Sequence, residues 1–328
     1  MKIAYIANLN SIHSKKWIEY FENKGHTVES YDTTLGISSI KYCVEQFHPD
    51  ILHAHYAGLN GFIGALCNYH PYIITVWGSD VIANYKNIFK RQLVKYGLNK
   101  ADLITCDAEH IMGCLSRYGV KPSKIKRINF GVDTGMFKPD KIKHSGKVVV
   151  SLRSLDKVYD VQTLIRAVPY VVKEIDDVVF KIYGDGTQRE YLEKLASKLG
   201  VSDYVEFCGK VEYNEIPKIL NSSDLYVSTA LSDAGIASST AEAMACGIYC
   251  IDTNCADNKY WANDQFTPRN FEELSNYIIS FLGSPRVGRI ISQSCVYNRK
   301  LIVEKDNYLI EMGKMEQLYE ECLNNSKS

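Results

Sequence analysis

The chain has 328 residues, 46% of them hydrophobic, so its length and composition predict about two domains with sizeable cores. Its 38 basic and 38 acidic residues cancel, which argues against a dedicated nucleic-acid-binding protein, because such a protein carries a basic surplus. The charge is unevenly distributed, since residues 1–140 hold 16 Lys and Arg against 12 Asp and Glu.

Short apolar runs alternate with amphipathic helical patterns in the first part of the chain. Strands are predicted at residues 2–7, 26–32, 50–56, 72–78, 101–107 and 124–131, and helices at 14–24, 38–47, 60–69, 84–98 and 109–119. Such alternation is typical of parallel sheets with helices on both faces. The polar residues 138–146, which include Pro and Gly, read as a linker.

The same rhythm restarts after the linker. Strands are predicted at residues 147–153, 178–184, 204–209, 225–230 and 249–253, and helices at 161–174, 189–200, 215–223 and 240–247. We therefore expect an α/β protein with two Rossmann-like domains, residues 1–140 and 147–305. A helical pattern in residues 306–328 predicts a C-terminal helix that packs back on the first domain.

Turns that follow strands are the candidate sites, because ligands of doubly wound sheets bind at the carboxyl ends of the strands. Arg153 and Lys157 follow a strand and can neutralise a diphosphate, although an ordinary solvated loop is the alternative. Gly184 opens a Gly-Asp-Gly turn before a helix, where backbone and anions can approach closely. Arg189 interrupts any G-x-G-x-x-G dinucleotide motif there. Main-chain groups around Val211 either read the edge of a base or form a connector.

The run LSDAGIASSTAEAMACG, residues 231–247, contains small and polar residues just before a predicted helix. Backbone amides at a helix start, together with the helix dipole, suit a phosphate. The residues that lead into this start are Gly235, Ile236 and Ala237. Glu242 can accept hydrogen bonds from ribose hydroxyls. Alternatively, Ser239 and Glu242 form the capping box S-x-x-E and serve only their own helix.

Ten cysteines are present without any C-x-x-C pair, and most lie in apolar runs, where a reduced thiol behaves as a small hydrophobic group. This usage predicts a reducing, cytoplasmic environment. The N-terminal segment lacks the features of a signal peptide, and no stretch has the length of about eighteen apolar residues that a membrane-spanning helix needs.

Together, in this order and spacing, these segments resemble the family 4 glycosyltransferases, which have the GT-B fold. The resemblance covers nearly the whole chain, through WIEYFENKGHTVESYD, HPDILHAHYAG, TVWGSD, INFGVDTGMFKP, LRSLDKVYDVQTLIRA, IYGDGTQREYLEKLA and DAGIASSTAEAMACG. It implies two sheets that face a central cleft, with an acceptor-binding first domain and a nucleotide-sugar-binding second domain. It also implies retaining transfer of a sugar to a saccharide or lipid-linked glycan in polysaccharide or glycoconjugate biosynthesis.

The resemblance implies roles for single residues. Arg153 and Lys157 would hold the donor diphosphate, Glu242 would bind the ribose, and the amides that follow Asp233 would cradle the phosphate or sugar. Asp233 is the candidate for the family's first acid, which contacts the donor sugar. It departs from that pattern as an Asp, not a Glu, nine positions before Glu242 where the family has eight. Trp77 stands where many relatives carry a His close to the donor sugar.

Metal chelation by a D-x-D motif is not expected, because the chain contains none. Arg153, Lys157 and helix amides would instead meet the charge of the leaving diphosphate. The donor is a substrate, so no cofactor and no metal are predicted. The alternatives are a GT-B sugar-nucleotide epimerase, for which His53 and His55 would be the acid and base, and a GT-B protein that binds nucleotide sugars without turnover.

A basic amphipathic segment follows in residues 84–100. Its basic residues are Lys86, Lys90, Arg91, Lys95 and Lys100, and apolar residues including Ile88 and Phe89 alternate with them. Such a helix either lies transiently on an anionic membrane surface or packs its apolar stripe on the sheet. In the loop after the first strand, His13 and Lys15 could face the cleft, although a lone His is more often structural.

Overall fold

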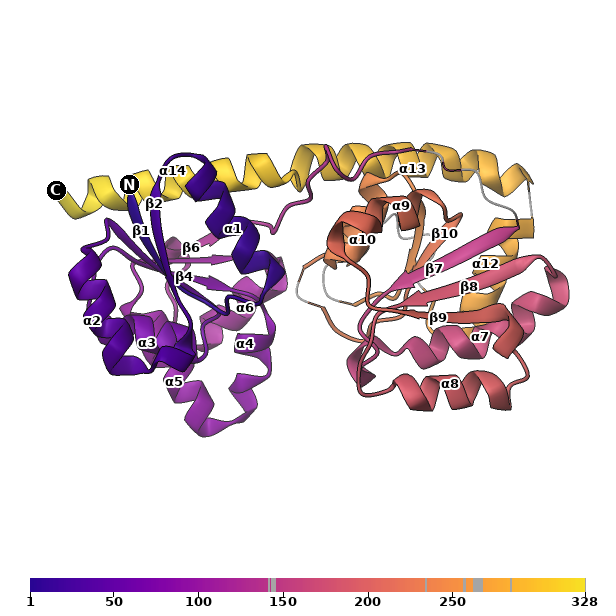
Figure 1. Ribbon diagram of the computed structural model, residues 1–328, viewed down its shortest axis with the longest axis horizontal. Helices are drawn as coiled ribbons and strands as arrows, with labels where there is room; N and C mark the ends of the chain where they lie inside the picture. The colour runs from indigo at the N-terminus through magenta and orange to yellow at the C-terminus, as the bar shows by residue number, and fades with distance from the viewer. Residues whose placement is uncertain are drawn as a thin grey trace. The chain divides into compact units, whose positions relative to one another are not determined.

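The computed structural model describes residues 1–140, 142, 146–233, 235–255, 258–261, 268–283 and 285–327. The chain divides into two compact units, Met1–Gly131 with Leu309–Ser328, and Val132–Tyr308 (Figure 1). Residues 132–140 group with the second unit and not, as predicted, with the first. The reason is that Val132 and Phe137 are buried in the second unit's core. Within the predicted linker, residues 141 and 143–145 lie outside the described residues.

A six-stranded parallel sheet forms the centre of the first unit, in the order β2-β1-β3-β4-β5-β6. The strands are β1 (Lys2–Ile6), β2 (Thr27–Tyr31), β3 (Ile51–His55), β4 (Tyr72–Val76), β5 (Leu103–Cys106) and β6 (Ile125–Arg127). The helices are α1 (Ile12–Asn23), α2 (Ile37–Phe47), α3 (Leu59–Cys67), α4 (Ser79–Ile82), α5 (Ile88–Lys100) and α6 (Glu109–Arg117), with short 3₁₀ helices at Thr33–Leu35, Asn84–Lys86 and Pro122–Lys124. The β-α alternation predicted for this half is present.

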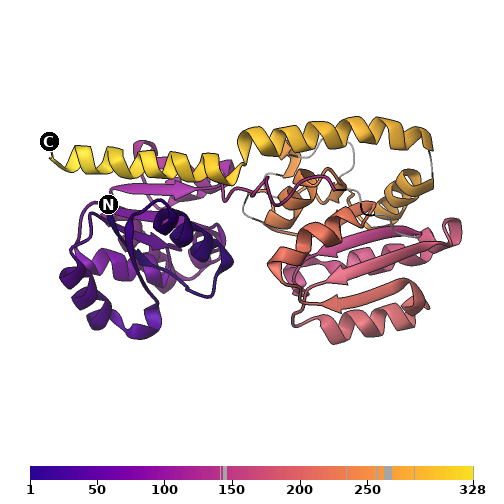
Figure 2. The same ribbon diagram turned by 45° about the horizontal axis from the view of Figure 1, so that its top comes forward.

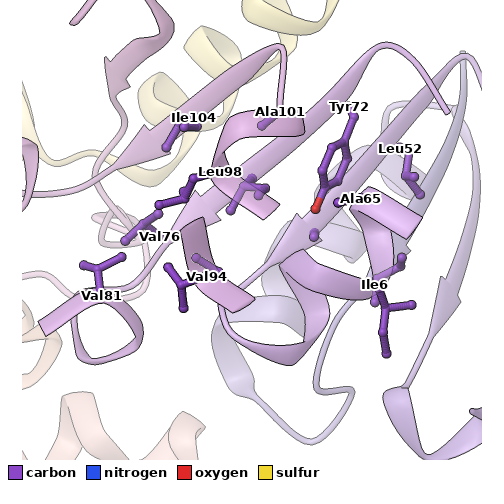
Figure 3. Close-up of a cluster of buried hydrophobic side chains, with 14 of the residues drawn as sticks. Ile6, Leu52, Ala65, Tyr72, Val76, Val81, Val94, Leu98, Ala101 and Ile104 are labelled. Atoms are coloured by element: carbon purple, nitrogen blue, oxygen red, sulfur yellow. The ribbon is translucent and has the colours of Figure 1, made fainter. Parts of the chain in front are cut away.

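The core of the first unit lies between this sheet and the helices of one face (Figure 3). Every residue of β3 and β4 is buried, which explains why both read as nearly continuous apolar runs. Helices α3 and α5 are closely packed at Gly97. A Cβ atom on Gly97 would lie 2.9 Å from the carbonyl oxygen of Gly61. A larger residue at Gly97 would therefore push α5 away from α3.

Helix α14 (Tyr308–Lys327) is joined to the first unit by a buried hydrogen-bond network. Tyr319 Oη lies 2.8 Å from Tyr5 Oη and 2.6 Å from His53 Nδ1. The other ring nitrogen of His53 lies 2.7 Å from Thr75 Oγ1. These partners satisfy polar groups that burial would otherwise penalise. The network therefore ties the C-terminal helix to strands β1, β3 and β4.

The second unit contains a five-stranded parallel sheet in the order β11-β10-β7-β8-β9. The strands are β7 (Lys147–Leu152), β8 (Val178–Tyr183), β9 (Val205–Gly209), β10 (Leu225–Ser228) and β11 (Tyr249–Asp252). The helices are α7 (Val161–Glu174), α8 (Arg189–Lys198), α9 (Ile216–Asn221), α10 (Ser238–Ala245), α11 (Asn258–Trp261), α12 (Phe271–Gly283) and α13 (Pro285–Lys305), with 3₁₀ helices at Lys157–Tyr159, Ser202–Tyr204 and Tyr213–Glu215. Figure 1 shows α13 and α7 on different sides of this sheet, and Figure 2 gives a turned view of the same ribbon.

All ten cysteines are free thiols. Among the described residues, no helix combines the length and the hydropathy that crossing a membrane requires.

Candidate functional site

The carboxyl ends of β7 and β10 bring a cation and an acid together in the second unit. Arg153 directly follows β7, and its Nη2 atom donates to Asp233 Oδ1 at 2.7 Å. Its Nη1 atom lies 3.4 Å from Ser239 Oγ, and the guanidinium packs over the ring of Tyr159 at 4.4 Å. Arg153 is buried and Asp233 is half-buried. Because buried charges require partners, this pair fixes the position of both side chains.

The first turn of α10 is hydrogen-bonded to the two neighbouring strands. Ser239 Oγ lies 2.8 Å from the hydroxyl of Tyr226 on β10, and Thr240 Oγ1 donates to Asp252 Oδ1 on β11 at 2.9 Å. Burial raises the pKa of Asp252 to about 7. The Cys255 thiol lies 3.9 Å from Asp233 Oδ2. The start of α10 is thus held against the same sheet edge as Arg153.

Helix α10 begins without a side-chain cap, since its N-cap is Ala237, whose methyl side chain cannot accept a hydrogen bond from the first amides. Ser239 and Glu242 occupy the second and fifth helical positions, which are not those of a capping box, so that interpretation is wrong. Gly235 and Ala237 are buried and Ile236 is half-buried beside this start. The first amides of α10 therefore remain available to an anion.

Glu242 lies in the second turn of α10 and is buried. The hydroxyl of Tyr213 donates to its Oε1 atom at 2.9 Å, and the Tyr213 ring packs edge-on against Phe137 at 5.5 Å. Burial and the neighbouring Glu242 carboxylate both raise the pKa of Tyr213, so its hydroxyl stays protonated and can donate. The carboxylate is thus held in one orientation by a residue outside the predicted site.

Lys157 lies in the 3₁₀ helix that also contains Tyr159. Its side chain is exposed and has no hydrogen-bond or ion-pair partner among the described residues. The Lys157 ammonium group is therefore free to bind an anion. Lys157 follows Arg153 closely in the sequence.

Gly184 has a steric function at the end of β8. Its φ is +125°, and a Cβ atom there would lie 2.2 Å from the carbonyl oxygen of Arg153. Its amide donates to the carbonyl of Gly209 at 2.7 Å. Gly184 thus brings the loops after β7, β8 and β9 together, and half-buried Val211 follows in the last of these loops. Close backbone packing is the role that these contacts give Gly184.

A separate aromatic cluster lies at the carboxyl ends of β1, β4 and β6 in the first unit. The ring of His13 stacks on Phe130 at 4.5 Å and meets Trp77 edge-on at 5.5 Å. Burial, with a smaller contribution from Lys16, lowers the pKa of His13 to about 4, so the imidazole is neutral at neutral pH. Lys15 is exposed. Trp77 thus contacts the imidazole of His13, which is contributed by the first turn of α1.

His53 and His55 are almost completely buried in the core of the first unit. His53 is occupied by Tyr319 and Thr75, and His55 Nδ1 lies 3.3 Å from Ser14 Oγ. Burial lowers the pKa of both rings, that of His55 to about 3. Neither ring lies at a surface where it could exchange protons with a substrate, which removes the acid and base suggested for an epimerase.

Sequence reasoning predicted Arg153, Asp233 and the start of α10, which the structure places in one network, but it missed other members. These are Tyr159, Tyr213, Tyr226 and Asp252. Asp252 carried a usable signal, because it is the polar last residue of an otherwise apolar strand. The three tyrosines did not, since each contacts a residue of another element. Among the described residues, no group of three or more His, Cys, Asp or Glu side chains is arranged to hold a metal ion.

Comparison with known proteins gives the context for this geometry. Residues 134–300 match the family of glycosyl transferases group 1, and residues 29–108 match a glycosyl transferase 4-like family. The chain is 28% identical over 250 residues to the N-acetyl-alpha-D-glucosaminyl L-malate synthase of Bacillus anthracis, which covers 68% of this chain and 61% of that protein. The chain spans between 39% and 63% of the first curated relatives that it matches.

Solved structures share the fold across the chain. The sucrose-phosphate synthase of Thermosynechococcus elongatus has a TM-score of 0.84 at 16% identity, with 98% of each chain covered. HepE of Anabaena, solved in complex with UDP, has a TM-score of 0.80 at 15% identity, with 98% of this chain and 100% of that chain covered. The α/β fold is therefore that of the GT-B glycosyltransferases. Since the group 1 model matches more than half of its residues, the chain belongs to the glycosyl transferases group 1 family.

Proposed function

We propose that the protein is a retaining, metal-independent glycosyltransferase that takes a sugar from a nucleotide-diphosphate sugar. The observation that carries this proposal is the placement of Arg153 beside the uncapped start of α10. A guanidinium and free helix amides are both suited to a diphosphate. Exposed Lys157 adds a second cation to the same loop. HepE, which has the same fold, binds UDP, and this supports a uridine nucleotide as one candidate donor.

Each residue then has a defined task. Arg153, Lys157 and the amides around Gly235 and Ile236 would stabilise the negative charge that develops on the leaving diphosphate. Glu242, oriented by Tyr213, would accept hydrogen bonds from the ribose hydroxyls. Asp233 would contact the hydroxyls of the donor sugar. The leaving phosphate would take the acceptor proton on the same face, so no protein nucleophile is invoked.

The proposed acceptor is a saccharide or lipid-linked glycan bound by the first unit, in the assembly of a cell-surface polysaccharide or glycoconjugate. The half-buried aromatic cluster of His13, Trp77 and Phe130 supports this assignment, because aromatic side chains offer a large apolar contact surface to a ligand. A cytoplasmic enzyme is proposed, in agreement with ten free thiols.

A thermal-shift screen against UDP-, GDP-, ADP- and CMP-sugars, with magnesium or with EDTA, tests the donor site. We expect one nucleotide sugar to raise the melting temperature equally in both conditions. A shift only with magnesium would refute metal independence, and no shift with any of them would refute the site. Donor turnover is then followed by NMR with simple saccharide acceptors, where an inverted anomeric configuration in the product would contradict retention. Binding without any turnover would favour the alternative of a non-catalytic nucleotide-sugar-binding protein.

A further inference from the structure

The start of helix α5 carries two apolar side chains that the fold leaves uncovered. Ile88 and Phe89, its first two residues, are 60% and 83% exposed. The helix start itself is well formed, because the Asn87 side chain caps it by accepting from the amide of Lys90 at 3.1 Å. The two side chains are therefore presented by an ordered turn.

The rest of α5 prevents these residues from turning inward. Val94 and Leu98, on the opposite side of the helix, are buried in the core of the first unit (Figure 3). Gly97 fixes the helix tightly against α3, as described above. Helix rotation that buried Phe89 would expose Val94 and Leu98 instead. Figure 1 shows α5 at the far end of the first unit from α14. The exposed fractions of Ile88 and Phe89 show that the described residues leave most of both side chains uncovered.

The surroundings of the pair are strongly basic. Residues 82–101 contain no Asp or Glu, and they include five basic residues, Lys86, Lys90, Arg91, Lys95 and Lys100. The lysines among these are exposed, and none of the five forms an ion pair with a described residue. Arg91 instead packs over the ring of Tyr85 at 5.3 Å. The apolar pair is thus flanked by cations that form no ion pair within the part of the chain that the structure describes.

We propose that the segment from Ile82 to Lys100 docks the protein on an anionic lipid surface, with Ile88 and Phe89 inserted among the acyl chains. The lysine stems can cover apolar surface while their ammonium groups reach lipid phosphates. A fluid lipid surface requires no shape complementarity, whereas a protein partner would require a complementary surface around two protruding side chains. The lipid surface is therefore the occupant that this arrangement favours.

The test measures binding to vesicles in the absence of sugar donor and acceptor, so that its result is independent of the proposed reaction. The full chain is sedimented with vesicles of pure phosphatidylcholine, or of phosphatidylcholine with phosphatidylglycerol. We expect binding only to the anionic vesicles, weakening as salt is added. The double variant Ile88→Ser/Phe89→Ser should bind at least about tenfold more weakly. Tyr42→Ser is the matched control, because Tyr42 is 63% exposed on α2, where Lys41 and Glu45 pair at 4.0 Å.

Several outcomes would overturn the proposal. These are no binding of the wild-type protein, equal binding to both vesicle types, or unchanged binding by the double variant. A wild-type dimer in light scattering that becomes a monomer in the double variant, without vesicle binding, would assign the surface to a second copy. The variant Phe89→Trp keeps the apolar character in case the serine variant unfolds. Its tryptophan emission should shift to the blue on anionic vesicles and be quenched by brominated lipid, and an unshifted emission would refute insertion.

Discussion

Arg153 Nη2 lies 2.7 Å from Asp233 Oδ1, so the cation proposed to bind the diphosphate is paired with the acid proposed to contact the donor sugar. Removing either partner of a buried pair leaves an uncompensated charge. A diphosphate that reaches Arg153 must therefore share the guanidinium with Asp233 or displace it. The two side chains are coupled in a way that their spacing of 80 residues along the chain did not reveal.

Asp233→Asn separates the two roles of the acid. We expect it to lower kcat with a sugar donor at least about tenfold, since a contact to the reacting sugar is lost. The affinity for the free nucleoside diphosphate should stay equal or increase, because a negative charge beside Arg153 is removed. Arg153→Gln should weaken binding of the same nucleotide at least about tenfold. Calorimetry measures both affinities. Equal weakening by the two variants would mean that Asp233 only positions the arginine.

Ala237→Ser introduces a side-chain cap at the start of α10. A serine N-cap stabilises a helix by about 0.5–2 kcal/mol, but its oxygen would compete with a phosphate for the same amides. We therefore expect a higher free energy of unfolding and weaker donor binding. Ala108, the buried and equally uncapped N-cap of α6, provides the control, since Ala108→Ser should leave donor binding unchanged. Unaltered donor affinity in Ala237→Ser would show that the donor phosphates do not use the start of α10.

Tyr213→Phe tests whether the hydroxyl orients Glu242 for the ribose. The loss of one partly buried hydrogen bond should cost about 0.5–1.5 kcal/mol of stability, and misalignment of Glu242 should weaken nucleotide binding several-fold. The readout that separates orientation from folding is the comparison of a ribonucleotide with its 2′-deoxy analogue, a preference that should shrink in the variant. Tyr204→Phe, a half-buried tyrosine of the same unit, should change neither. An unchanged preference for ribose would contradict the assigned role.

The strands of both units, and the helices that alternate with them up to α10, were largely predictable from the sequence, because parallel strands buried on both faces read as apolar runs and the helices between them are amphipathic. Helices α12 and α13 were not predicted. The position of Arg153 at the end of β7 followed from the same pattern. The capping interpretation of Ser239 failed because helix boundaries depend on backbone geometry, which a motif does not specify. Tyr213 and Tyr226 could not be predicted, since the partners of their hydroxyls, Glu242 and Ser239, are contributed by a different element.

The boundary between the two units could not be predicted from local sequence pattern either. A polar stretch marked residues 138–146 as a linker, whereas the division at Val132 depends on core contacts of Phe137 with residues distant in sequence. The buried His53 is a further example, because its hydrogen bond to Tyr319 spans 266 residues. Local pattern therefore predicted the elements, while long-range packing decided which polar residues are structural.

Asp252 gives the protein a predicted pH dependence of stability. Burial is the main cause that raises its pKa to about 7 from the ordinary value of 3.8, while Thr240 and Arg153 act in the opposite direction and Asp233 in the same direction. Between these two values the unfolded chain loses the proton that the folded chain keeps. The free energy of unfolding should therefore fall as pH rises from about 4 to 7, by up to roughly 4 kcal/mol.

Asp252→Asn should remove this loss, because an amide mimics the protonated acid and has no charge to bury. Denaturant unfolding of both proteins at pH 5 and pH 8 measures the effect. The free energy of unfolding of the variant, relative to that of the wild type, should increase with pH. The difference in free energy of unfolding between the two proteins at each pH is independent of the other titrating groups, because both proteins share them. Asp203→Asn, which removes an exposed carboxylate of the same unit, should have the same free energy of unfolding as the wild type at both pH values. A constant difference between Asp252→Asn and the wild type would mean that Asp252 is ionised in the folded protein and that Arg153 compensates its charge.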